Sequence, residues 1–181
     1  MFHLNTELLI DYWRARRGER PMPARADIDP ADFAALMPQT FIAVLEADGE
    51  IRFRLAGEVI NDLHGRALRG EAVAALWRPA HRRHLVGALE ASLRGAEPLV
   101  VDAEGVQGDD MARHVEILFA PLTGPDGRAD RFLGLYQPSP PYSRAAKGPV
   151  RDLAIRGVNG AEGRPVPPKL RLAVVDGRRI A

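Results

Sequence analysis

Hydrophobic and polar residues alternate in two runs of the stretch TFIAVLEADGEIRFRLAG, and the pair Asp48-Gly49 lies between them. An Asp-Gly pair between alternating runs is the strongest short-range signal of a β-hairpin. With a two-residue turn, the core face is expected to carry two cross-strand pairs, Ile42 with Leu55 and Val44 with Phe53. The opposite face of the hairpin then carries Ala43, Leu45, Arg52 and Arg54.

Longer stretches show the 3.6-residue spacing of amphipathic helices. The segment LNTELLIDYWRARRG predicts a helix that begins at an N-cap Asn5 and ends at Gly18. A second, shorter helix is expected between the pair Asp29-Pro30 and Pro38. The longest internal helix is predicted over residues 79–94, before a stop at Gly95, and one face of it is formed by Leu85, Leu89, Ser92 and Leu93.

Three further stretches, EPLVVDAE, ARHVEILFAPL and DRFLGLYQP, predict three strands after the long helix. Two strands, short helical pieces, a long helix and three strands favour an α+β fold with a five-stranded antiparallel sheet. The chain is expected to divide into an N-terminal helical cap (1–38), a central domain (39–138) and a linker-like C-terminal tail (139–181). Within the tail, only KLRLAVVDGRRIA is expected to form a strand, which docks on the domain or on a partner.

The order of these elements resembles that of a PAS domain. More narrowly, the chain is similar to a family of small, stand-alone PAS proteins found largely in proteobacteria. The resemblance rests on LLIDYWRARRGERPMPARADIDP, on FRLAG followed by GRALRG, on LW near residue 77 and on PL…DGRADRFLG, and it covers about residues 4–138. It implies a PAS fold, in which a five-stranded antiparallel sheet is flanked by short helices and one long helix, with an N-terminal cap helix.

The resemblance also implies a cytoplasmic signalling role without intrinsic catalysis. Two modes of action stay open, which are sensing of a small hydrophobic ligand in a PAS cavity and a ligand-free adaptor for a histidine kinase or similar partner. For the sensor, the side chains expected to line the cavity are Ile42, Val44, Phe53, Leu55, Leu63, Trp77, His81, Leu85, Ile117, Phe119 and Tyr136. A third hypothesis is a small enzyme with a conical pocket that uses His81 or His114 as its acid or base.

Histidine and cysteine limit the cofactors to be considered. Some PAS sensors bind haem through a histidine of the long helix, and on the predicted helix His81 faces the cavity while His84 faces outward. The alternative is a histidine at the rim of the cavity that binds no metal. The chain has no cysteine, which excludes a flavin–thiol adduct and thiolate metal sites. We predict no metal site and no catalytic residues.

Partner surfaces are predicted on the N-terminal helix and on the hairpin. The helix carries an apolar stripe of Leu8, Leu9, Tyr12 and Trp13, which either covers the outer face of the sheet or pairs two chains into a homodimer. In the adaptor, a partner surface is expected around Leu45, Arg54 and Trp13. Alternatively, Arg54 forms an ion pair with Asp27 or Asp29.

Charge and hydropathy exclude some other classes of protein. The net charge is +1, which gives no support for nucleic-acid binding. No apolar run approaches the roughly 18 residues of a membrane span. The first twenty residues carry acids early and arginines late, the reverse of a signal peptide. A soluble cytoplasmic protein is therefore expected.

Overall fold

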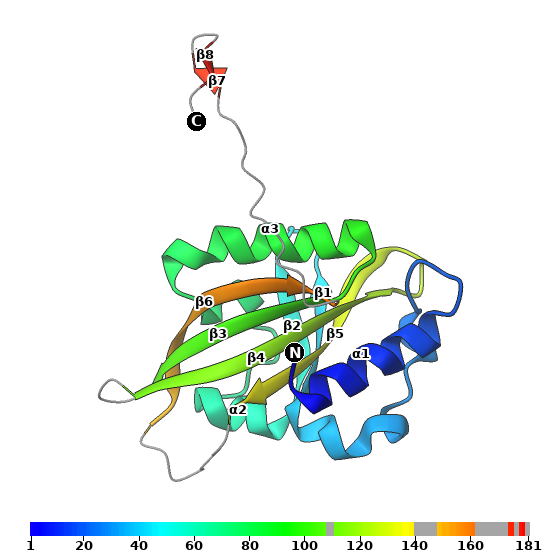
Figure 1. The fold of residues 1–181 in the computed structure, drawn as a ribbon, viewed down its shortest axis with the longest axis horizontal. Coiled ribbons are helices and arrows are strands. Elements are labelled where there is room, and N and C mark those ends of the chain that lie inside the picture. Colours follow the sequence, from blue (N-terminus) through cyan, green and yellow to red (C-terminus); the bar gives the residue numbers. More distant parts are fainter. Residues whose placement is uncertain (108–110, 140–147, 162–173, 176–177, 180–181) are drawn as a thin grey trace.

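The computed structural model describes residues 1–107, 111–139, 148–161, 174–175 and 178–179 (Figure 1). An antiparallel sheet of six strands has the order β2-β1-β5-β4-β3-β6. Its strands are β1 (Thr40–Leu45), β2 (Ile51–Ala56), β3 (Leu99–Gln107), β4 (Met111–Thr123), β5 (Ala129–Pro138) and β6 (Val150–Gly160). The α-helices are α1 (Leu4–Arg17), α2 (Glu58–His64) and α3 (Pro79–Gly95), and the 3-10 helices are η1 (Arg25–Asp27), η2 (Pro30–Gln39) and η3 (Val73–Leu76).

The N-terminal helix α1 forms as predicted, but its N-cap is His3 and not Asn5. The Nδ1 atom of His3 accepts a hydrogen bond of 3.1 Å from the backbone N–H of Asn5. Asn5 lies inside the first turn, where its side-chain amide donates to Oε1 of Gln137 at 2.9 Å. The predicted end is confirmed, because Gly18 has a φ of 57° and donates its N–H to the carbonyl of Arg14. Glycine adopts this left-handed conformation without a steric penalty.

The β1–β2 hairpin forms with a register that differs from the predicted one. Its turn is longer than two residues, because the N–H of Glu46 donates to the carbonyl of Glu50 at 2.9 Å. Ile42 opposes Leu55 as predicted, whereas Phe53 opposes Ala43, so Arg54 is the extra residue of a bulge in β2. A shift of one residue moves side chains to the other face of a sheet.

The predicted core face of this hairpin is therefore wrong for three of its four residues. Phe53 lies on the face of the sheet that packs against α2 and α3. Ile42 packs on the opposite face. Val44 shares the face of Ile42 because side chains alternate along a strand, and Leu55 shares it because it is the cross-strand neighbour of Ile42.

The helices between β2 and β3 agree with the sequence pattern. Along α3, the buried side consists of the predicted residues Leu85, Leu89, Ser92 and Leu93. This helix includes Gly95, which was predicted to stop it, and its C-cap is Ala96 at a φ of 54°. The N–H of Ala96 donates to the carbonyl of Ser92, so a hydrogen bond at the helix end holds the left-handed residue in place.

The sheet has a sixth strand, β6, that the sequence analysis did not predict. The three predicted strands after α3 are confirmed as β3, β4 and β5, and β6 pairs antiparallel with β3 at the edge of the sheet. Four side chains of β6 are buried, Val150, Leu153, Ala154 and Val158. Of the predicted C-terminal strand, Val174–Val175 (β7) and Arg178–Arg179 (β8) pair with each other, and the remainder lies outside the described residues.

Two layers of apolar side chains cover the two faces of the sheet. The inner core lies between the sheet and the helices α2, η3 and α3. The outer core lies on the other face, where α1 packs in front of β4 and β5 (Figure 1). Leu9, Ile10 and Trp13 of α1 are at most 2% exposed. The cap helix therefore covers the outer face of the sheet within one chain.

Candidate functional site

Four aromatic side chains meet at the centre of the inner core, and each comes from a different strand. The Phe41 ring makes edge-to-face contacts with Phe53, Phe119 and Tyr136, at centroid distances of 5.4, 5.2 and 5.8 Å. Gly134 makes room for Phe41, because a Cβ atom at this position would overlap the ring. Each aromatic pair contributes about 0.5–1.5 kcal/mol beyond its buried area. The centre of the fold is thus built of mutually packed rings.

Seven of the eleven predicted cavity residues come together in this inner core. They are Phe53, Leu63, Trp77, Leu85, Ile117, Phe119 and Tyr136, and none is more than 3% exposed. The exposed area of a side chain includes the wall of any internal void that admits a water molecule. Values this close to zero therefore mean that the seven side chains contact other atoms and not an open cavity.

The other four predicted cavity residues lie elsewhere. Ile42 and Val44 alternate along β1 with the inner residues Phe41 and Ala43, so they lie on the outer face of the sheet. The bulge in β2 places Leu55, which is 44% exposed, on the same face. His81 lies at the edge of the inner core, where its Nδ1 atom accepts a hydrogen bond of 2.7 Å from the N–H of Ile155. This histidine therefore fastens the sixth strand to α3. His84, which was predicted to face outward on the same helix, is exposed.

Sequence reasoning missed the most deeply buried histidine, His64, which lies in the last turn of α2. It is 2% exposed, and its Nδ1 atom donates to the carbonyl oxygen of Val150 at 3.3 Å. Burial lowers the pKa of His64 from 6.5 to about 4, because the charged imidazolium loses its hydration. The available signal was its spacing, since Ile60 and Leu63 share the buried side of the same helix.

The inner core holds two further side chains with polar groups, Tyr136 and Trp77. The Tyr136 ring stands 5.9 Å from the ring of His64, and burial raises the pKa of the Tyr136 hydroxyl. Within the described residues, the His64 Nε2 and Trp77 Nε1 atoms have no hydrogen-bond partner. Buried polar groups without a partner are uncommon in folded proteins and are costly to the folded state.

The predicted interface residues divide between buried and exposed positions. Leu9 and Trp13 are buried in the outer core, and the indole N–H of Trp13 donates to the Pro121 carbonyl at 2.7 Å. Tyr12 packs edge-to-face on Phe33. Leu8, in contrast, is 53% exposed. The stripe predicted on α1 is therefore wrong for Leu8, which faces away from the sheet.

The predicted partner surface on the hairpin does not form as one exposed patch. Leu45 is partly buried against the inner core, whereas Trp13 is buried in the outer core on the other face. Arg54 is 60% exposed and pairs with Glu46 at 2.9 Å, not with Asp27 or Asp29. The bulge and the longer turn of the hairpin explain the difference, because they bring Arg54 and Glu46 together.

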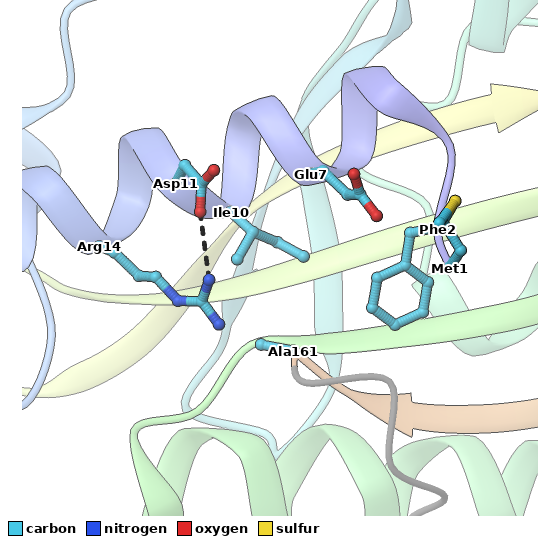
Figure 2. Close-up of a pocket in the computed structure, with 7 residues that line it drawn as sticks. All are labelled: Met1, Phe2, Glu7, Ile10, Asp11, Arg14 and Ala161. Carbon is cyan, nitrogen blue, oxygen red and sulfur yellow. Dashed lines mark hydrogen bonds and ion pairs between the residues drawn. The ribbon is translucent and has the colours of Figure 1, made fainter.

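A pocket of about 330 Å³ lies beside α1 and the end of β6 (Figure 2). It is lined by Met1, Phe2, Glu7, Ile10, Asp11, Arg14 and Ala161. Arg14 forms an ion pair with Asp11 at 3.1 Å on the helix wall of this pocket. The pocket opens to solvent, and the side chains of Arg14 and Asp11 on its wall are 44% and 72% exposed.

His114, considered above as an acid or base, lies on the outer face of β4. Its Nε2 atom pairs with Asp102, and its Nδ1 atom lies 2.7 Å from the hydroxyl of Ser139. The N–H of Ser139 donates to the carbonyl of His114, so it cannot stabilise an oxyanion there. The side chains of His114 and Asp102 are 49% and 41% exposed. The arrangement links β3, β4 and the residue that follows β5.

Neither a metal centre nor a membrane span is found in the part of the chain that the structure describes. No cluster of three or more histidine or acidic side chains in these residues has the geometry to hold an ion. None of the helices in the same residues has the length and apolar character needed to cross a membrane.

The fold is an α+β domain in which an antiparallel sheet carries α2, η3 and α3 over one face and the cap helix α1 over the other. A sequence model of the PAS domain family matches residues 1–137. The chain therefore belongs to the PAS domain family, and the fold is the PAS fold with six strands in place of the predicted five. Among curated proteins, no significant match to this chain exists.

Several solved structures are similar to parts of this chain. The PAS domain of a protein from Colwellia psychrerythraea is 16% identical, with a TM-score of 0.44, over 60% of this chain and 96% of that chain. The PAS domain of BvgS from Bordetella pertussis is 19% identical, with a TM-score of 0.43, over 60% and 85% of the two chains. A LOV protein from Rhodobacter sphaeroides is 15% identical, with a TM-score of 0.47, over 66% and 73%. The family assignment rests on the sequence match.

Proposed function

We propose that this chain is a signalling PAS module that acts through protein–protein contacts and holds no small ligand in its core. The observation that carries the proposal is the packing of Phe41 against Phe53, Phe119 and Tyr136 at the centre of the inner core. A ligand there would have to displace these rings from close-packed positions, which costs dispersion and hydrophobic energy. Intrinsic catalysis is not part of the proposal, because the acid–base pair of His114 and Asp102 is open to solvent.

The wider setting of the proposal follows the resemblance stated above. A small, stand-alone bacterial protein in the cytoplasm, which binds a histidine kinase or a similar regulatory partner, is the setting that the resemblance implies. A stand-alone module of the kind that the resemblance implies transmits a signal by binding another protein. The PAS family membership supports the signalling role, and the packed core supports the adaptor over the sensor.

One observation favours the second candidate, a ligand sensor. His64 Nε2 and Trp77 Nε1 are buried without a partner among the described residues, and a polar ligand would satisfy such atoms. Both side chains are nevertheless at most 2% exposed, so no room for a ligand adjoins them in this conformation. The adaptor is therefore the function that the geometry supports best.

The proposal is tested by comparing the wild-type protein with Phe119→Ala, which opens a cavity at the centre of the inner core. Small apolar probes such as benzene and indole enter engineered cavities of this kind. We expect these probes to raise the melting temperature of Phe119→Ala and to leave that of the wild-type protein unchanged. A rise in the wild-type melting temperature would contradict the adaptor and favour the sensor.

A further inference from the structure

The pocket beside α1 and the end of β6 combines an apolar wall with charged groups (Figure 2). Ile10 is 2% exposed, and Phe2 and Ala161 pack against the outer core, so these three side chains form the apolar wall. At 100° per residue, Glu7, Ile10 and Arg14 lie within about 60° of one another on α1. The charged groups of the pocket therefore stand next to its apolar wall.

The carboxylate of Glu7 differs from the other partly buried carboxylates of the protein. Within the described residues, it is the only one that has neither an ion pair nor a hydrogen bond. Asp27, for example, pairs with Arg20 at 2.8 Å, and Glu46 pairs with Arg54 at 2.9 Å. Every remaining one is likewise paired or hydrogen-bonded. A charge that is partly shielded from water is costly without a partner, so Glu7 stands to gain from a bound cation.

The other charged side chains of the pocket neutralise each other. Arg14 forms an ion pair with Asp11 at 3.1 Å. Met1, at the rim of the pocket, is fully exposed, and its amine forms no ion pair with Glu7. Two acidic side chains and one basic side chain leave one net negative charge among the lining side chains, and it belongs to Glu7.

We propose that this pocket binds a small aliphatic amine. Its ammonium group contacts the Glu7 carboxylate, and its hydrocarbon chain lies along Phe2 and Ile10. A hydrogen bond between two charged groups is stronger than one between neutral groups. The hydrocarbon chain is stabilised by leaving water for the apolar wall. An apolar surface with a few polar groups that fix the orientation is the usual composition of a small-molecule site.

The size and the charge of the pocket select this class of ligand. Its volume of about 330 Å³ is at the lower end of the roughly 300–1,000 Å³ of small-molecule pockets, which limits the ligand to a short chain. An anion of the same length would be repelled by the unpaired charge of Glu7. A neutral alcohol would contact the apolar wall and leave Glu7 without an ionic partner.

The exposure of the pocket sets the strength of binding. The pocket opens to solvent, and water and salt weaken a partly exposed ion pair. The amine therefore binds weakly and reversibly, and the protein releases it during purification. This inference goes beyond the proposed function, because the pocket lies beside α1 on the outer face of the sheet and the inner core lies on the other face.

The ligand class is tested by titrating the full-length protein with n-hexylamine at low salt and following the amide chemical shifts by NMR. We expect saturable shifts that are largest at residues 2–14 and at Ala161. Two probes of the same chain length, 1-hexanol and hexanoate, are expected to bind at least about tenfold more weakly. The absence of saturable shifts with n-hexylamine, or equal binding of 1-hexanol, would overturn the proposal.

The site is tested with variants in the same titration. Glu7→Gln removes the charge and keeps the length of the side chain, and we expect it to raise the dissociation constant of n-hexylamine at least about tenfold. The matched control is Glu19→Gln, at an exposed acid just beyond α1, which leaves the constant unchanged. Phe2→Ala is expected to weaken binding of n-hexylamine several-fold, because it shortens the apolar wall. Equal dissociation constants for the wild type and a folded Glu7→Gln variant would overturn the assignment of the site.

Discussion

The Nδ1 atom of His81 in α3 accepts a hydrogen bond of 2.7 Å from the backbone N–H of Ile155 in β6. Nearby, the N–H of Arg78 donates to the carbonyl of Leu153 at 2.9 Å. The outer edge of the sixth strand is thus held by the start of the long helix. An edge strand that pairs on both sides exposes fewer free backbone groups to other chains.

Removing the imidazole of His81 is expected to loosen β6. His81→Ala leaves the N–H of Ile155 without its partner, and we expect the free energy of unfolding to fall by about 1 kcal/mol. Amide hydrogen exchange should become faster at Ile155 than in the wild-type protein. The matched control is His84→Ala, three residues along the same helix at an exposed position, which should change neither quantity. Unchanged exchange at Ile155 in His81→Ala would show that the hydrogen bond does not hold the strand.

Substitution of glycine by alanine is expected to have opposite effects on stability at two positions, Gly134 and Gly87. A Cβ atom at Gly134 would overlap the Phe41 ring, so Gly134→Ala must displace the aromatic cluster and is expected to destabilise the protein by about 3 kcal/mol. Gly87 lies in α3 with nothing near the position of a Cβ atom, and Gly87→Ala is expected to stabilise the protein by about 0.5–1 kcal/mol. Chemical denaturation measures both changes. Equal effects of the two substitutions would contradict the packing described for Phe41.

The buried histidine predicts a loss of stability in mild acid. Above pH 6.5, His64 is neutral in the folded and unfolded chains, whereas below it the unfolded chain binds a proton that the folded chain refuses until about pH 4. The free energy of unfolding should therefore fall between pH 6.5 and about 4, by about 3 kcal/mol at most from this group.

The comparison variant for this pH dependence is His64→Leu, which cannot take up a proton. Denaturant unfolding of the wild type and of His64→Leu at a series of pH values isolates the contribution of His64. We expect the wild-type curve to fall more steeply than the variant curve in this range of pH. Parallel curves would mean that His64 titrates alike in the folded and unfolded chains.

Periodicity predicted the elements of this fold where the backbone is regular. The buried side of α3 and the strands β3, β4 and β5 follow from simple 3.6-residue and two-residue spacing. The same periodicity gave the wrong face where a bulge interrupts a strand. The extra residue Arg54 in β2 moves Leu55 to the outer face, and no local signal in the sequence marks that bulge.

The sixth strand was missed for a related physical reason. The register between β3 and β6 shifts at two places, and the buried residues Val150, Leu153, Ala154 and Val158 are three, one and four positions apart. That spacing does not match the two-residue period of a regular strand. The glycines and the asparagine at the end of β6 are typical of turns, and they concealed the strand further.

The candidate site was predicted in part. The apolar residues of the inner core were found because strand and helix patterns identify buried faces, as for Phe119 and Leu85. Whether those side chains enclose a cavity or fill the space depends on how their volumes fit together in three dimensions, which a single sequence does not reveal. The role of His81 depends on β6, so it could not be predicted while that strand was missed.

The central claim is that the inner core is filled by side chains. The most direct measurement is the mass of the freshly purified full-length protein under native and then denaturing conditions, together with its absorption spectrum. The account predicts that each chain has the mass of the polypeptide alone in both conditions, with no absorption band in the visible range. A compound released on denaturation at one molecule per chain, or a haem or flavin band in the spectrum, would contradict it.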